Sequence, residues 1–220
     1  MRVAMETYKT EFLNFVVKEE ILQFGEFTLK SGRVSPYFFN AGLFNTGKKL
    51  SFLAECYAAA IESSSLDFCT LFGPAYKGIP LVSATAVALA TNHGIDKAYC
   101  FNRKENKNHG EGGWIVGSEL VGDVLVIDDV ITAGTAIKEA ANIIRESKAN
   151  FSGVVVAMDR QEKGNGSLSA IQEAEKAYEI SIIHIINLQD IISFLEKSDN
   201  PNLQINIKAV NAYRDRYGVK

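Results

Sequence analysis

Positive charge is not in excess in this chain of 220 residues, which has 23 Lys and Arg against 26 Asp and Glu and a formal net charge of −3. A surface that holds nucleic acid normally needs a strongly basic face, so we expect no nucleic-acid partner. The sequence also lacks an apolar run of membrane-spanning length, and we expect no membrane association. An anionic ligand would have to meet a local cluster of donors.

Cysteine is scarce as well. Cys56, Cys69 and Cys100 form an odd count without CxxC or Cys/His ligand spacing. This pattern predicts neither a disulfide framework nor a zinc site, and a reducing cytoplasm is the simplest setting. Repeats, low-complexity tracts and linkers are also lacking, so we expect residues 1–220 to form a single domain.

The order of the expected elements predicts an α/β fold. A small N-terminal hood, to about residue 45, begins with an amphipathic helix and continues with short strands at 24–33 and 35–42. In a core from about 46 to 187, apolar strands alternate with helices, which indicates a parallel sheet flanked by helices on both faces. Helical segments complete the chain to residue 220. Within the core we expect strands at 68–72, 98–101, 124–130, 153–158 and 181–186, helices at 48–63, 79–92, 133–146 and 167–178, and an irregular loop at 102–118.

The strongest chemical pattern is VLVIDDVITAGTA, residues 124–136. Four apolar residues place Asp128 and Asp129 at the carboxyl end of a buried strand, where they can accept hydrogen bonds from a sugar diol. The Thr-Ala-Gly-Thr turn then opens into a helix and offers hydroxyl and N–H groups to a phosphate monoester. Gly134 lets the backbone approach that anion without a Cβ in the way. The alternative is an ordinary turn with a threonine cap, but adjacent carboxylates on the buried side are costly unless something binds them.

Several separated segments together resemble type I phosphoribosyltransferases and, among these, the orotate phosphoribosyltransferase family. In the family's order they are FTLKSGRVSPYFFN, GPAYKGIPL, FNRKENKNHGEGG, VLVIDDVITAGTA and AMDRQE. The resemblance implies a type I phosphoribosyltransferase-like sheet with a hood. It also implies transfer of ribose 5-phosphate from phosphoribosyl pyrophosphate (PRPP) to orotate in pyrimidine biosynthesis, giving orotidine 5′-monophosphate and pyrophosphate. Mg²⁺ would be the cofactor, held mainly through the substrate, with no protein metal site.

The resemblance further implies a homodimer in which the charged segment 101–113 reaches the active site of the neighbouring subunit. Lys104, Lys107, His109, Asp128 and Asp129 are then expected to act in catalysis. On the residues alone, the charged segment could be a solvated loop and Lys77 a solvated surface lysine. The residues expected to bind PRPP are Lys30, Tyr76, Lys77, Arg103, Lys104, Lys107, His109, Asp128, Asp129, Val130, Ile131, Thr132, Ala133, Gly134, Thr135 and Ala136.

Orotate is expected to contact Phe38, Phe39, Thr132 and Arg160. Arg160 follows the strand 153–158, and its planar fork of donors matches the carboxylate that orotate carries. Two alternatives stay open: Arg160 could pair with a local Glu, and at least one of the two phenylalanines should face the core. Two rival functions also stay open, a purine phosphoribosyltransferase and a non-catalytic regulator that senses PRPP.

Overall fold

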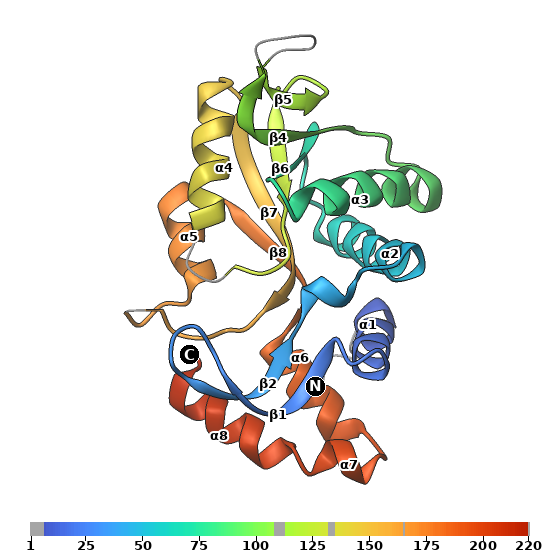
Figure 1. The fold of residues 1–220 in the computed structure, drawn as a ribbon, viewed down its shortest axis with the longest axis vertical. Coiled ribbons are helices and arrows are strands. Elements are labelled where there is room, and N and C mark those ends of the chain that lie inside the picture. The colour runs from blue at the N-terminus through green and yellow to red at the C-terminus, as the bar shows by residue number, and fades with distance from the viewer. Residues whose placement is uncertain (1–6, 108–112, 132–134, 165, 220) are drawn as a thin grey trace.

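The computed structural model describes residues 7–107, 113–131, 135–164 and 166–219. Its centre is a six-stranded sheet of order β5-β4-β3-β6-β7-β8 (Figure 1). β3 pairs in parallel with β4 and with β6, and β6, β7 and β8 continue in parallel, whereas β5 is antiparallel to β4. The strands are β3 (Thr70–Gly73), β4 (Ala98–Lys107), β5 (Gly113–Gly117), β6 (Asp123–Ile127), β7 (Asn150–Asp159) and β8 (Ser181–Asn187).

The sheet has a topological switch point at β3. After β3 the chain places β4 on one side, and it then returns to place β6 on the other. In open α/β sheets a crevice forms beyond the carboxyl ends of two such strands, and ligands bind there. The loops that follow β3 and β6 are therefore the expected place for a site.

Helices cover both faces of the sheet, as the sequence predicted. α2 (Gly47–Ser64) and α3 (Gly78–His93) lie on one face, and α4 (Thr135–Glu146) and α5 (Ala170–Tyr178) lie on the other (Figure 1). Successive β6 residues alternate between the two layers, because Leu125 packs in the core beneath α2 and Val126 in the core beneath α4. A strand buried on both faces needs an uninterrupted apolar run, which explains the pattern of β6.

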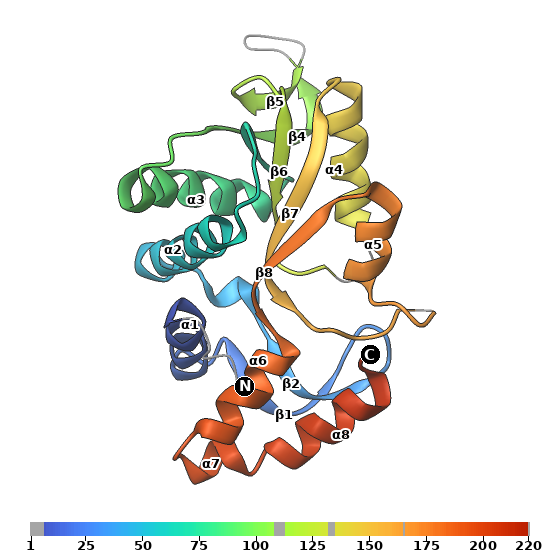
Figure 2. The same ribbon diagram turned by 180° about the vertical axis from the view of Figure 1, so that it is seen from behind.

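The hood is built from the first and the last described elements of the chain. α1 (Thr7–Lys18) precedes an antiparallel pair, β1 (Leu22–Thr28) and β2 (Val34–Phe39), and a short 3₁₀ helix follows at Ala41–Leu43. The C-terminal helices pack against these elements, with α6 on α1 and α8 on β2. Figures 1 and 2 show the end of the last helix beside the turn between β1 and β2. These helices are α6 (Leu188–Lys197), α7 (Pro201–Gln204) and α8 (Ile207–Tyr217).

The expectation of an irregular loop at 102–118 was wrong for most of that segment. β4 continues to Lys107 and forms a hairpin with β5, in which Asn102 lies opposite Ile115 and Lys107 opposite Gly113. β5 is the edge strand, and ladder hydrogen bonds join backbone groups, so a polar, Gly-rich sequence can form them without an apolar period. Residues 108–112 lie outside the described part of the chain.

Over the described residues, no helix combines the length and the apolar character that crossing a bilayer would require.

Candidate active site

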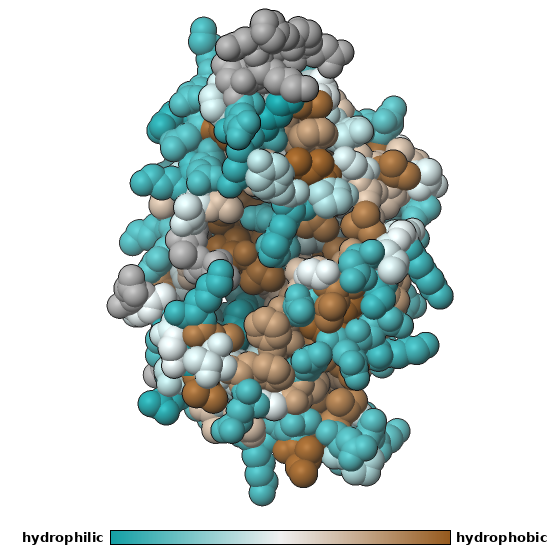
Figure 3. Space-filling view, in the orientation of Figure 1, coloured by the Kyte–Doolittle hydropathy of each residue, from teal (hydrophilic) through white to brown (hydrophobic). Residues whose placement is uncertain are grey.

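A cleft of about 290 Å³ lies where the loop after β3 meets the turn after β6. Figure 3 shows this face of the molecule hollowed near its middle, with apolar and polar residues side by side. The cleft is at the switch point of the sheet, as the strand order predicts. The described residues that line it are Pro74, Ala75, Tyr76, Lys77, Asp128, Asp129, Val130, Ile131, Thr135, Ala136, Ile137 and Glu139.

The turn after β6 is held by its own carboxylates. Asp129 N–H donates to Asp128 Oδ1 at 2.9 Å, and Val130 N–H donates to Asp129 Oδ1 at 2.9 Å. The neighbouring strand continues the ladder on either side, because Asp128 N–H donates to Val155 O and Ala157 N–H donates to Asp129 O. In each carboxylate, Oδ1 thus accepts a hydrogen bond from the backbone of the turn, and Oδ2 remains for other partners, which for Asp129 include Lys77.

Asp128 is the buried member of the pair, with 8% of its surface exposed. Burial, and after it the negative charge of Asp129, raise the pKa of Asp128 to about 6. The Asp129 N–H and the Lys77 ammonium act in the opposite direction, because both favour the ionised form. At neutral pH the cleft therefore contains a buried carboxylate that a hydroxyl donor of a ligand would stabilise.

The loop after β3 is tightly folded because of two glycines. A Cβ on Gly73 would lie 2.2 Å from the carbonyl oxygen of Gly78, so no larger side chain fits there. Gly78 N–H donates to Pro74 O, and Ala75 N–H donates to Asn102 Oδ1 at 2.8 Å. The side chain of Asn102, on β4, thus holds the loop after β3 in place, although Asn102 and Ala75 are 27 positions apart in the sequence.

Lys77 connects this loop to the turn after β6. Its ammonium lies 2.5 Å from Asp129 Oδ2, while 69% of the Lys77 side chain is exposed. An exposed ion pair contributes little to stability, so an anionic ligand can compete for the ammonium at small cost. Lys77 is therefore not simply a solvated lysine.

Among the other described residues expected to bind PRPP, Tyr76 lines the cleft, and Lys30, Arg103 and Lys104 are not among its lining residues. Tyr76 is 67% exposed, and the Lys104 ammonium lies 5.7 Å from the centre of its ring. Arg103 is partly buried on β4, and Lys30 is exposed in the turn between β1 and β2. The Lys107 backbone lies at the end of β4, whereas its side chain is not described and His109 lies outside the described residues.

The N-terminus of α4 forms another wall of the cleft. Thr135 and Ala136 line it, and the first turn of a helix presents unpaired N–H groups that favour an anion. The described part of this helix starts at Thr135, and the predicted start at residue 133 lies outside the described residues. The other three turn residues named for PRPP, Thr132, Ala133 and Gly134, lie outside the described residues.

Arg160 is paired with a local glutamate, which was the alternative left open by the sequence. Arg160 Nε lies 2.7 Å and Nη2 lies 2.6 Å from Glu162 Oε1, and Nη2 also donates to Ser35 Oγ at 3.0 Å. The guanidinium lies 4.3 Å from the centre of the Tyr37 ring. The edge of the guanidinium that carries Nε and Nη2 is thus occupied by Glu162 and Ser35. The role of Arg160 in orotate binding stays a prediction.

The two phenylalanines of β2 point to opposite sides. Phe39 is 8% exposed and belongs to the core, as one of the pair was expected to do, whereas Phe38 is 37% exposed and stacks on Phe27. Phe38 is consequently the member with a free face for a planar base. Among the described residues, the lining of the cleft includes neither phenylalanine nor Arg160.

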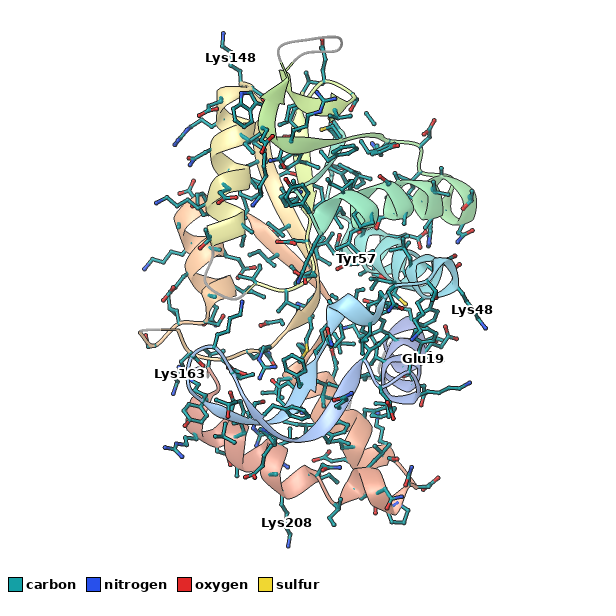
Figure 4. The ribbon with its side chains drawn as sticks, viewed as in Figure 1. Glu19, Lys48, Tyr57, Lys148, Lys163 and Lys208 are labelled. Carbon is teal, nitrogen blue, oxygen red and sulfur yellow. The ribbon has the colours of Figure 1, made fainter. Side chains whose placement is uncertain are left out.

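Sequence reasoning missed Tyr57, which touches the turn from behind. The Tyr57 hydroxyl donates to the backbone carbonyl of Asp128 at 2.7 Å, across 71 residues of sequence. Figure 4 labels Tyr57 near the centre of the molecule, where α2 meets the sheet. A tyrosine within an amphipathic helix carries no local signal for such a contact.

Comparison with known proteins agrees with this geometry. The phosphoribosyl transferase domain family matches residues 48–179. Orotate phosphoribosyltransferase of Aliivibrio fischeri is 58% identical over 216 residues, which are 98% of this chain and 100% of that protein. The enzyme of the same name from Shewanella oneidensis is 56% identical with the same coverage. The crystal structure of orotate phosphoribosyltransferase from Francisella tularensis covers 94% of this chain and 99% of its own, with a TM-score of 0.85 and 43% identity.

Proposed function

This chain belongs to the orotate phosphoribosyltransferase family, and we propose how its cleft transfers ribose 5-phosphate from PRPP to orotate. A bond forms between the ring nitrogen of orotate and the anomeric carbon of PRPP, the bond from that carbon to pyrophosphate breaks, and the proton of the nitrogen passes to solvent or to the departing pyrophosphate. The contact between Lys77 and Asp129 carries the proposal, because it joins the two loops that such a substrate would bridge.

Each wall of the cleft suits one part of PRPP. Asp128 and Asp129 would accept hydrogen bonds from the ribose hydroxyls through their Oδ2 atoms. The N-terminus of α4 would hold the 5-phosphate, and the loop 73–78 with Lys77 would hold the pyrophosphate. Positive charge develops on the ribose when pyrophosphate departs, and two nearby carboxylates would stabilise it.

We further propose that the reaction depends on Mg²⁺ held mainly by substrate oxygens. Among the described residues, no three His, Cys, Asp or Glu side chains form a metal cluster. Asp129 already binds Lys77 and Val130 N–H, so the side chains present do not make a cage. Mg²⁺ commonly binds through substrate phosphates and water with little help from protein, so the donor set fits it. When bound, it would neutralise charge on the leaving pyrophosphate.

The active enzyme is proposed to be a cytoplasmic homodimer that shares its charged segment between subunits. The β4–β5 hairpin carries Arg103, Lys104 and the chain toward His109, and it lies at the end of the molecule opposite the hood (Figure 1). Trp114 on this hairpin is 52% exposed, as expected for a surface that another copy covers. The three free cysteines fit a reducing compartment.

The test follows orotate absorbance after PRPP and Mg²⁺ are added to the purified protein, with hypoxanthine, adenine and uracil as competing bases. We expect Mg²⁺-dependent consumption of orotate alone. Turnover of a purine would favour the purine enzyme, and PRPP binding without any turnover would favour the regulator.

A further inference from the structure

We propose that Tyr57 is a positioning residue, whose hydroxyl sets the orientation of both carboxylates in the PRPP cleft. This inference rests on the proposed function, since it concerns how the same cleft holds the ribose. Tyr57 does not line the cleft, and its hydroxyl reaches the cleft through the backbone carbonyl of Asp128.

The position of Tyr57 is rigid. It lies in the middle of the helix α2 (Gly47–Ser64), has no exposed surface, and belongs to the main hydrophobic core. Leu53 and Ile61, one turn away on either side, are also buried on this face of the helix. The ring is thus held by packing, and its hydroxyl is presented to one fixed point at the end of β6.

Nearly every backbone group of the turn has a partner within the sheet or the turn itself. The N–H groups of Asp128, Asp129 and Val130 donate to Val155 O, Asp128 Oδ1 and Asp129 Oδ1, and the Asp129 carbonyl accepts from Ala157 N–H. The Asp128 carbonyl differs, because its bond comes from a side chain of another layer. A buried carbonyl without a partner is costly, so this group depends on Tyr57.

One peptide plane couples this bond to the carboxylates. The Asp128 carbonyl and the Asp129 N–H belong to the same planar unit and cannot turn independently. Tyr57 holds the carbonyl, and Asp128 Oδ1 accepts from the N–H. If the peptide rotates in search of another donor, the N–H leaves the Asp128 carboxylate. Asp129, which follows that N–H directly, is displaced with it.

The chemistry of the hydroxyl fits a positioning role and not proton transfer. Burial holds the pKa of Tyr57 well above its usual range, and the charges of Asp129 and Asp128 raise it further. The hydroxyl therefore remains a donor throughout the working pH range. A donor that never titrates and never touches the ligand can act only through the group that it holds.

The experiment compares Tyr57→Phe with Ile61→Val in the full-length enzyme. Phe keeps the ring and removes only the hydroxyl, whereas Ile61→Val removes a buried methyl group one turn along α2 without touching the turn. We expect Tyr57→Phe to lower kcat/KM for PRPP by about 10- to 100-fold, since a small displacement of reacting groups has effects of this size. In Tyr57→Phe, KM for orotate should change less than about twofold. Ile61→Val should lose about as much thermal stability as Tyr57→Phe, yet leave kcat/KM for PRPP and KM for orotate unchanged.

A pH profile separates positioning from simple destabilisation. The Asp129 N–H lowers the pKa of Asp128, so its loss should move the acidic limb of kcat/KM to higher pH in Tyr57→Phe. The charged groups that act on Asp128, namely Asp129 and Lys77, are the same in both variants. An unmoved limb together with unchanged kcat/KM for PRPP would overturn the proposal, and so would an equal loss in Ile61→Val or a Tyr57→Phe chain that does not fold.

Binding of ribose 5-phosphate, measured by calorimetry, tests the role of Tyr57 independently of whether orotate is the base. If the wild-type chain failed to consume orotate but bound ribose 5-phosphate, the assignment of the base would fail. Weaker binding by Tyr57→Phe would still support the positioning role, and equal binding by the two proteins would contradict it.

Discussion

The ammonium of Lys77 lies 2.5 Å from Oδ2 of Asp129 and joins the loop after β3 to the turn after β6. The two residues are 52 positions apart in the sequence. In the proposed mechanism PRPP separates them, since the ribose takes the carboxylate and the pyrophosphate takes the ammonium.

Lys77→Gln should therefore reduce activity far more than stability. Losing one preorganised donor to developing charge costs about 3 kcal/mol of transition-state stabilisation. The ion pair is largely exposed on the lysine side, so the free energy of unfolding should fall by less than about 1 kcal/mol. Steady-state kinetics and urea unfolding measure the two quantities. The control is Lys208→Gln, an exposed lysine of α8 at the far end of the molecule (Figure 4), and equal kcat/KM in the two variants would remove Lys77 from the mechanism.

Asp128→Asn should stabilise the protein above neutral pH while it impairs PRPP turnover. The pKa of Asp128 is about 6 in the fold against 3.8 for the ordinary group, so above about pH 6 the folded state carries a buried charge that the unfolded state tolerates better. The penalty is absent below 3.8 and grows to roughly 3 kcal/mol at high pH. In urea unfolding, the free energy of unfolding of Asp128→Asn should exceed that of the wild type at about pH 8, and this difference should shrink to roughly half at about pH 5. A gain independent of pH would contradict the assigned burial.

The same residue sets the expected pH dependence of the wild-type enzyme. Protonated Asp128 cannot accept a second hydroxyl donor as well as the carboxylate does, so kcat/KM for PRPP should rise through about pH 6. In Asp128→Asn this limb should disappear and leave a low, flat profile. A limb that persists in the variant would assign it to another group.

Glu162→Ala should destabilise the hood. It leaves Arg160, whose side chain is only 15% exposed, without its anion, which costs about 3 kcal/mol in comparable buried pairs. Replacing both residues, as in Arg160→Met with Glu162→Ala, should recover part of that loss, because the charge of Arg160 is no longer left without its partner, although Arg33 still loses its contact with Glu162. Urea unfolding of the single and double variants tests this, and a double variant no more stable than Glu162→Ala would argue that the pair is not the source of the loss.

Lys107→Ala tests the proposed role of the charged segment 101–113. Loss of one donor to the leaving pyrophosphate should cost on the order of 3 kcal/mol in kcat/KM. The matched control is Lys148→Ala, an exposed lysine after α4 that Figure 4 labels. An unchanged kcat/KM for Lys107→Ala would exclude the charged segment from the mechanism.

Most of the fold follows from short apolar runs and helix periodicity. The start of α2 was predicted from Thr46, whose side chain accepts from Lys49 N–H. The β4–β5 hairpin was not predicted, because edge strands are held by backbone bonds that leave no apolar period in the sequence. The carboxylate turn was found because apolar residues, acids and a Gly turn are adjacent in the chain.

Contacts between distant segments could not be predicted in the same way. Tyr57 reads as a core residue of α2, and Asn102 as part of a polar loop, yet each holds one of the two cleft loops. The guanidinium of Arg160 was expected to bind a carboxylate, but the sequence could not show whether this carboxylate belongs to orotate or to a nearby glutamate such as Glu162. Contacts of this kind depend on which helices and strands pack against one another, and the spacing of apolar residues along the sequence does not show which ones do.

A crystal structure with Mg²⁺ and a non-hydrolysable PRPP analogue tests the central claim most directly. The account predicts ribose hydroxyls on Asp128 and Asp129, the 5-phosphate at the N-terminus of α4, and the diphosphate beside Lys77, with the Lys77–Asp129 contact opened. An analogue bound elsewhere, or bound here with that contact intact, would contradict it.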